Sequence, residues 1–146
     1  MSFVLGLVLG LLYGNLLEYC IHDFIFHRLG RKKDSVWSYH LKGHHRLSRK
    51  NNFIDLTESK AETVGMMFLI LIHLPLLYLS VGFWLGVTCY AASFKIVHGL
   101  MHKHPEFTKK YMKWHWDHHM KDSNKNFGVV APWADYLFGT RKKYDK

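Results

Sequence analysis

A run of 31 residues without a charged side chain, residues 64–94, constrains the fold of this chain most strongly. One helix needs only about 20 apolar residues to cross the hydrocarbon layer of a bilayer, so the run is too long for a single crossing. Two shorter helices, residues 62–79 and 83–99, with a turn at residues 80–82, fit it better. Pro75 would kink the first helix, which membrane helices tolerate. The run therefore predicts a helical hairpin within a membrane.

A second apolar block, residues 3–21, is also long enough to cross a bilayer as a helix. It has neither the basic start nor the small-residue cleavage site of a signal peptide, and it leads directly into a pair of histidines. We therefore expect a retained span. Together with the hairpin, this block predicts an all-α membrane bundle of about three spans and one domain over residues 1–146.

The positive charges are segregated along the chain. All 20 Lys and Arg residues fall within residues 28–60 or 95–146, and three spans would place both regions on one side of the membrane. The positive-inside rule makes that side the cytoplasm and puts the N-terminus outside. The formal charge of +9 could suit nucleic acid, but the long uncharged blocks argue against that partner. We expect an integral protein of the bacterial inner membrane or the endoplasmic reticulum, in contact with membrane lipids.

The only cysteines, Cys20 and Cys89, both lie in apolar stretches. Two such residues support neither a disulfide framework nor a thiolate zinc site. We expect both to be buried packing residues.

Histidine is unusually frequent, with twelve residues in 146. Ten of them form four clusters, namely His22 and His27; His40, His44 and His45; His98 and His102; and His115, His118 and His119. Residues three or four apart share a helix face and can point at one centre. The pairs related in this way are His40 with His44, His98 with His102, and His115 with His118 or His119. His22 and His27 are five apart, about 140° on a regular helix, so they need a helix end, a π-bulge or two different metals.

Ten imidazoles exceed the four to six ligands of one metal, so the clusters predict two metal ions. The lack of thiolates argues against structural zinc and iron–sulfur clusters, and iron suits oxygen chemistry. Glu18, Asp23 and Asp117 are candidates to orient the rings. Outside the clusters, we expect His73 to make a hydrogen bond between helices and His104 to lie in a loop. Two other classes are weaker alternatives. A metal transporter would place ligands at the membrane midplane, where only His73 lies, and adjacent pairs such as His44 and His45 do not suit a carrier of bis-histidine haem.

The histidine order HxxxxH, HxxxHH, HxxxH, HxxHH resembles that of the fatty acid hydroxylase and sterol desaturase superfamily, which includes the bacterial carotene hydroxylases. The closing segment, residues 124–140 (NKNFGVVAPWADYLFGT), is similar to the family's ending, an NFG turn followed by LFGT. The resemblance runs from about residue 18 to residue 140.

This resemblance implies a membrane enzyme with two iron ions at the cytoplasmic face, where zinc could replace iron in purified protein. It gives ligand roles to all ten clustered histidines. The implied reaction is hydroxylation of a fatty acyl, sphingoid, sterol or carotenoid substrate with dioxygen; desaturation by the same centre is the alternative. Since the sequence shows no fused cytochrome b5 module, the electrons would come from a separate carrier protein and its reductase. The residues that we expect to line the lipid path are Tyr13, Leu17, Phe24, Trp84 and Tyr90.

Overall fold

A computed structural model describes residues 1–57 and 59–145, and every regular element in this part of the chain is helical. The expected all-α class is thus confirmed. The elements in chain order are α1 (Phe3–Cys20), η1 (Ile21–Arg28), η2 (Leu29–Arg31), η3 (His40–His45), α2 (Arg46–Lys50), α3 (Lys60–Ile72), η4 (Leu74–Tyr78), α4 (Val81–Lys103), α5 (Pro105–Tyr111), α6 (Lys113–Met120) and α7 (Trp133–Leu137). η1 and η3 are π-helices, whereas η2 and η4 are 3₁₀ turns.

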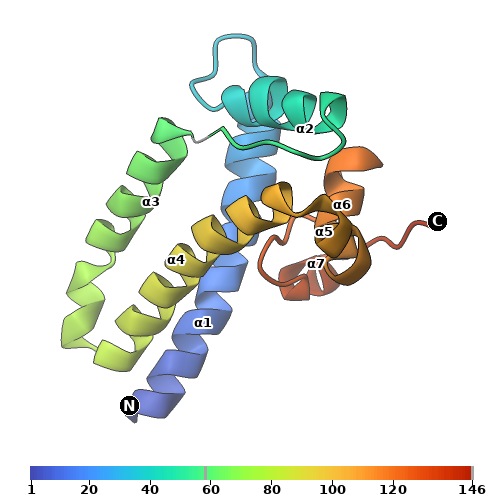
Figure 1. Ribbon diagram of the computed structural model, residues 1–146. Helices are drawn as coiled ribbons and strands as arrows, with labels where there is room; N and C mark the ends of the chain where they lie inside the picture. The colour runs from blue at the N-terminus through green and yellow to red at the C-terminus, as the bar shows by residue number, and fades with distance from the viewer. Residues whose placement is uncertain (58, 146) are drawn as a thin grey trace.

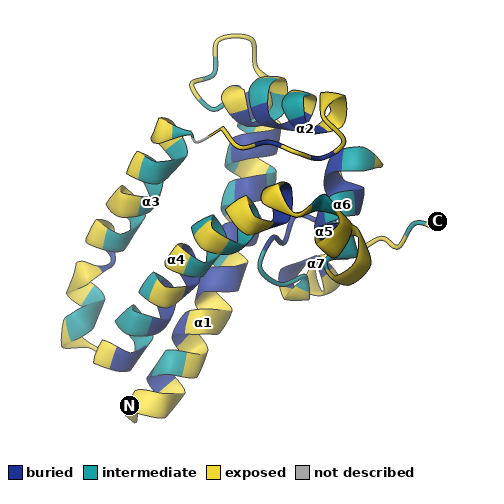
Figure 2. Cartoon of the chain, in the orientation of Figure 1, coloured by how far each residue is buried: buried dark blue, intermediate teal, exposed yellow. Residues whose placement is uncertain are grey.

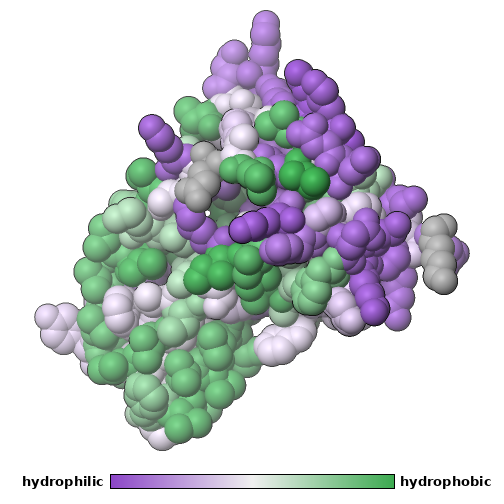
Figure 3. Space-filling view, viewed as in Figure 1, coloured by the Kyte–Doolittle hydropathy of each residue, from purple (hydrophilic) through white to green (hydrophobic). Residues whose placement is uncertain are grey.

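The molecule has two parts of opposite surface character. The long helices α1, α3 and α4 form one part, and the short helices gather around their ends as a cap (Figure 1). Hydrophobic atoms cover the visible face of the long helices, and hydrophilic atoms cover much of the cap (Figure 3). Two stretches, Phe3–Arg31 and Lys60–Tyr78, are long and apolar enough to cross a membrane by length and composition. Within the most apolar 18 residues of each stretch, only 33% and 6%, respectively, are buried within the protein. The apolar side chains of both stretches therefore mostly face outward.

The chain reverses between η4 and α4, as the sequence predicted. The Ser80 hydroxyl accepts a hydrogen bond from the Phe83 backbone N–H at 3.2 Å and so caps α4. α4 begins at Val81, inside the expected turn, because this cap needs only one residue outside the helix. α3 ends at Ile72, and Pro75 lies in the 3₁₀ turn that follows.

His73 ties this reversal to α1. Its Nδ1 lies 2.7 Å from the Leu69 carbonyl oxygen, which can only accept a hydrogen bond, so Nδ1 donates. Its Nε2 is then free to accept from the Tyr13 hydroxyl at 3.1 Å. The predicted hydrogen bond between helices is thereby confirmed.

Glycines let α1 and α4 pack closely. Gly6, Gly10 and Gly14 recur at every fourth residue of α1; Gly6 faces Gly82 of α4, Gly10 faces Gly86, and Gly14 faces the Tyr90 ring. A Cβ at Gly86 would lie 2.5 Å from the Leu7 carbonyl oxygen, closer than real Cβ atoms come. Small residues at this spacing allow the backbones of membrane helices to touch. Dark blue buried positions accordingly follow the facing sides of α1 and α4, whereas α3 carries none (Figure 2).

The expected burial of the cysteines was wrong, since Cys20 and Cys89 are both exposed. The inner face of α1 is occupied by the glycine row and Glu18. Cys20 follows Glu18 by two residues, a rotation of about 200°, and so turns away from the helix pair.

Candidate metal centre

The structure brings all ten clustered histidines together at the junction between the long helices and the cap. Five of them offer one ring nitrogen each within 4.8 Å of one another. This first set consists of His22 and His27 from η1, His40 and His45 from η3, and His118 from α6. All five are buried.

A second set lies beside the first. It consists of His44 from η3, His98 and His102 from α4, and His119 from α6, again within 4.8 Å. His115 lies next to this set, with its Nε2 3.3 Å from the Nε2 of His102 and its ring centroid 4.6 Å from that of His119. Two sets of imidazoles thus match the predicted number of two metals.

The π-helices explain how the first set forms. A π-helix bonds residue i to residue i+5, so residues five apart lie on one face. His22 and His27 in η1 have this spacing, as do His40 and His45 in η3. The requirement for a π-type turn at the first pair is met. The expected pairing of His40 with His44 was wrong, because η3 joins His40 to His45 instead.

Adjacent histidines divide between the two sets. His44 and His45 point to different sets, and so do His118 and His119. Neighbouring residues are turned by about 100° on an α-helix such as α6, and by somewhat less on the wider π-helix η3, so each pair can serve two centres from one short segment.

The ring protons are placed by the partners of the Nδ1 atoms. The Nδ1 atoms of three histidines face carbonyl oxygens, which only accept: His22 faces Phe127 at 2.5 Å, His118 faces Lys125 at 2.7 Å, and His102 faces Phe53 at 2.7 Å. These three Nδ1 atoms therefore carry hydrogen. In these neutral rings each Nε2 atom therefore carries a lone pair, which points into one of the two sets.

Lone pairs converging in this way repel one another unless a cation lies between them. With metal–nitrogen bonds of about 2.0–2.1 Å, two ligand nitrogens lie about 2.9 Å apart when the N–metal–N angle is a right angle. They lie about 3.4 Å apart when that angle is tetrahedral. The observed separations are 2.9 Å for the Nε2 atoms of His22 and His40, 3.1 Å for His27 and His118, and 3.1 Å for His44 and His98. The donor set therefore fits two metal ions.

Burial supports the same interpretation. Neither ring nitrogen of His119 has a hydrogen-bond partner among the described residues, although the side chain is fully buried. Leaving such a group unsatisfied costs about 1–3 kcal/mol. Burial, with a further contribution from neighbouring histidines, lowers the pKa of His45 and His119 well below the ordinary value. Both rings are therefore neutral and able to bind metal at physiological pH.

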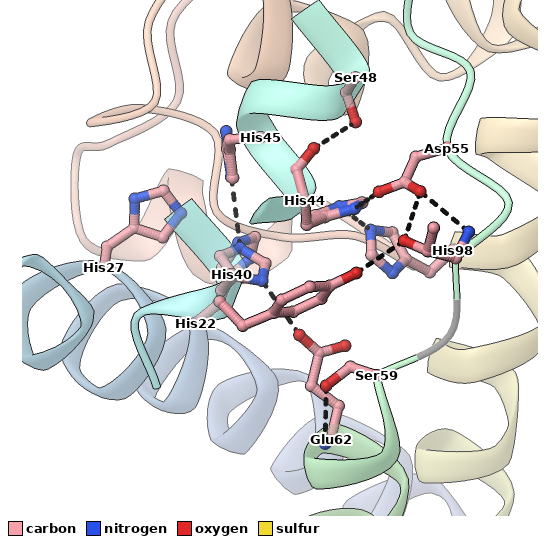
Figure 4. Close-up of polar contacts among 12 residues, drawn as sticks. His22, His27, His40, His44, His45, Ser48, Asp55, Ser59, Glu62 and His98 are labelled. Atoms are coloured by element: carbon pink, nitrogen blue, oxygen red, sulfur yellow. Dashed lines mark hydrogen bonds and ion pairs between the residues drawn. The ribbon is translucent and has the colours of Figure 1, made fainter. Parts of the chain in front are cut away.

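Two carboxylates that the sequence did not single out contact ring nitrogens. Asp55 lies 2.7 Å from Nδ1 of His44, and Glu62 lies 3.4 Å from Nδ1 of His40 (Figure 4). Thr57 fixes Asp55 from the other side, with its backbone N–H and its hydroxyl donating to Oδ1 at 2.9 and 2.6 Å. Burial alone would raise the pKa of Asp55, but the hydrogen bonds from His44 and Thr57 outweigh it and lower that pKa. Asp55 is therefore an anion that holds the Nδ1 proton of His44.

The three carboxylates that were expected to orient the rings contact other groups instead. Asp23 pairs with Arg28 at 2.5 Å, and Asp117 pairs with Lys113 at 2.7 Å. Glu18 accepts hydrogen bonds from the Tyr90 hydroxyl and from the backbone N–H groups of Val129 and Val130. It thereby anchors the segment before α7 to α1. Spacing could not reveal Asp55, because it acts from a loop rather than from a helix turn.

The mutation Asp55→Asn is expected to weaken metal binding at the second set by about 10- to 100-fold, because an amide lacks the charge that holds the His44 tautomer. Titration with a chelator, followed by metal analysis, would measure the affinity of each site. Asp23→Asn is the matched control, since its carboxylate pairs with an exposed arginine instead of a ring nitrogen. Equal metal retention by both variants would contradict the role of Asp55.

An apolar cavity of about 450 Å³ reaches the first set. It lies between α1, η1, α3 and α4 and has His22 and Glu62 in its wall. The apolar side chains that line it include Leu17, Ile21, Phe26, Leu69, Val87 and Phe94. A smaller cavity of about 100 Å³ borders His44, His98 and His102 of the second set and shares Glu62, Met66 and Phe94 with the first cavity.

The residues expected to line a lipid path are only partly placed there. Leu17 and Tyr90 line the apolar cavity, whereas Trp84 lies outside its lining. Tyr13 bonds to His73, and Phe24 is exposed. Phe24 differs because it follows the inward-facing His22 by two residues, about half a turn of η1, and so lies on the outer side of this helix.

The family model of the fatty acid hydroxylases matches residues 7–140, which include every histidine of both sets. The chain belongs to the fatty acid hydroxylase family. The match confirms the resemblance noted in the sequence.

A curated protein is similar to this chain. It is the ceramide very long chain fatty acid hydroxylase SCS7 of Saccharomyces cerevisiae, 27% identical over 143 residues. The match covers 90% of this chain but 36% of the yeast protein, so the chain spans about a third of that relative's length. No solved structure matches the chain.

Proposed function

We propose that the protein spans a membrane three times, with its N-terminus outside and the histidine sets at the cytoplasmic face. The outward apolar surface of α1 and α3 supports this placement. α4 has 23 residues, about 35 Å of helix, and packs along α1. The cap carries most of the Lys and Arg residues, as the positive-inside rule requires of a cytoplasmic part.

We further propose that the protein is a di-iron hydroxylase of a lipid-like substrate, with all ten clustered histidines as ligands. The observation that carries this proposal is the apolar cavity whose wall contains the first-set histidine His22. Its size suits a small ligand, and its lining suits an alkyl chain. Iron held by the histidines would supply activation of dioxygen, with electrons from a separate carrier protein and its reductase.

The protein's own residues supply positioning. The Phe127 carbonyl holds the Nδ1 proton of His22 and fixes the ring beside the cavity. Asp55 does the same for His44. The apolar wall places one segment of an alkyl chain beside the His22 ring and excludes water, and such positioning is worth several orders of magnitude in rate.

The test is turnover under ¹⁸O₂ by iron-reconstituted protein in lipid vesicles, with an external reductase system. We expect one ¹⁸O atom per product lipid, measured by mass spectrometry. A product that has lost two hydrogens and gained no oxygen would show desaturation instead. The mutation Gly65→Phe should lower turnover by about 10- to 100-fold while metal content stays unchanged. Gly65 lines the cavity, and a Cβ there has open space around it, so a large side chain would fill the cavity without a backbone clash.

Val64→Phe is the matched control for the cavity. Val64 is the preceding residue of α3 and is 64% exposed, so the same added ring would point outward. Equal turnover of the two variants would contradict the assignment of the cavity to the substrate.

A further inference from the structure

We propose that α7 and the basic segment after it lie in the headgroup region of the cytoplasmic leaflet and bind an anionic lipid surface. This inference rests on the proposed membrane placement. It concerns the exposed residues Trp133, Tyr136, Leu137 and Phe138, and the cations Arg141, Lys142 and Lys143. These seven residues are called the α7 surface below.

The depth of this surface follows from its contacts with α1. The Asn15 amide donates to the Ala131 carbonyl at 2.8 Å and accepts from the Ala134 N–H at 3.0 Å. Asn15 is one residue from Leu16 and three from Leu12, both outward-facing apolar residues, so each leucine lies within about 5 Å of Asn15 along the helix axis. The N-terminal end of α7 is therefore held at a level where α1 faces hydrocarbon.

α7 has two unlike faces. Ala134 and Asp135 are buried against the protein, whereas Trp133 and Leu137 are 58% and 69% exposed. Tyr136 and Phe138 extend the exposed face. Tryptophan and tyrosine are enriched at membrane interfaces, and a helix with one apolar face lies in the plane of the interface. The composition of the α7 surface matches its depth.

The charges next to α7 match a lipid surface. Residues 141–145 carry three cations and one carboxylate, and Lys142 and Lys143 are exposed. The Arg141 guanidinium lies 5.9 Å from the ring centroid of Tyr136, so the basic segment begins beside the aromatic face. Basic residues at this level are attracted to the anionic lipids of a cytoplasmic leaflet.

The α7 surface is also connected to the first histidine set. The Asp135 carboxylate accepts hydrogen bonds from the N–H groups of Phe127 and Gly128 at 2.8 and 2.7 Å. The Phe127 carbonyl in turn orients His22. A lipid contact on α7 therefore supports the loop that positions a metal ligand.

Nitroxide labels would test the depth. In a Cys20→Ala, Cys89→Ala background, single labels at Leu137→Cys, Leu9→Cys and Val36→Cys would be compared in vesicles of phosphatidylcholine with and without phosphatidylglycerol. Relaxation by oxygen and by a water-soluble nickel chelate reports the depth of each label. We expect the label at residue 137 to be relaxed mainly by oxygen, like the label at Leu9 on the lipid-facing side of α1. The label at Val36, 79% exposed in the loop after η2, should be relaxed mainly by the chelate.

A second experiment tests whether the basic residues bind anionic lipid. Phosphatidylglycerol should deepen the label at residue 137, and the double variant Lys142→Gln, Lys143→Gln should abolish that change. No effect of phosphatidylglycerol would overturn the anionic assignment. Suppose that the label at Leu9 reports the bilayer. The inference would then be overturned if the label at residue 137 were relaxed mainly by the chelate or were shielded from both reagents. If the label at Leu9 were also in water, the membrane placement itself would fail.

Discussion

His118→Ala and His119→Ala are each expected to remove one metal ion, and the two variants should lose different ions. The side chains are adjacent and both fully buried, but His118 belongs to the first set and His119 to the second. Each position offers a nitrogen that no neighbouring residue can replace, so turnover should fall by more than about 100-fold in both variants. Metal analysis of iron-reconstituted protein, with spectroscopy of the remaining ion, would measure the result.

His104→Ala is the control for these ligands. His104 lies at the end of α4, outside both sets, and its loss should leave metal content and turnover near normal. His73→Ala should lower thermal stability more than metal content, because His73 bonds to Tyr13. Zinc in a purified sample would not contradict an iron centre, since zinc also binds imidazole tightly and can displace iron. Two iron ions per chain and normal turnover after replacing both His44 and His118 would disprove the proposed centre.

Gly10→Ile is expected to prevent α1 and α4 from packing and to destabilise the fold by roughly 3 kcal/mol or more. A Cβ at Gly10 would overlap the Phe83 carbonyl oxygen and lie 3.0 Å from the Cα of Gly86. Both contacts are with backbone atoms, which cannot rotate away as a side chain can. Thermal unfolding in detergent and the yield of monodisperse protein would measure the loss.

Gly99→Ala is the control for the glycine row. No atom lies within 4 Å of a Cβ at Gly99, so alanine there should be neutral or stabilise α4 by up to about 1 kcal/mol. Gly10→Ala should lower the unfolding temperature. The same unfolding temperature for Gly10→Ala and Gly99→Ala would disprove the role of close helix packing.

Much of the site could be read from spacing in the sequence. The spacing of His22 and His27 required a π-type turn or a helix end, and η1 is a π-helix. Histidines outside the four clusters, His73 and His104, lie outside both sets. Glycine at every fourth residue of α1 is a further signal in the sequence, because small residues at this spacing allow the close contact that α1 makes with α4.

The sequence by itself determined the all-helical class and the chain reversal at Ser80, and it predicted which histidines gather at one site, because hydropathy and spacing act over one or two helix turns. Only the tertiary structure decided how the histidines divide into two sets. It also decided that the Phe127 carbonyl and Asp55 orient the rings. These choices depend on contacts between segments far apart in the chain, such as His22 with Phe127, 105 residues later. No local period encodes such contacts; they arise when α1 and α4 pack together and the cap folds over their ends.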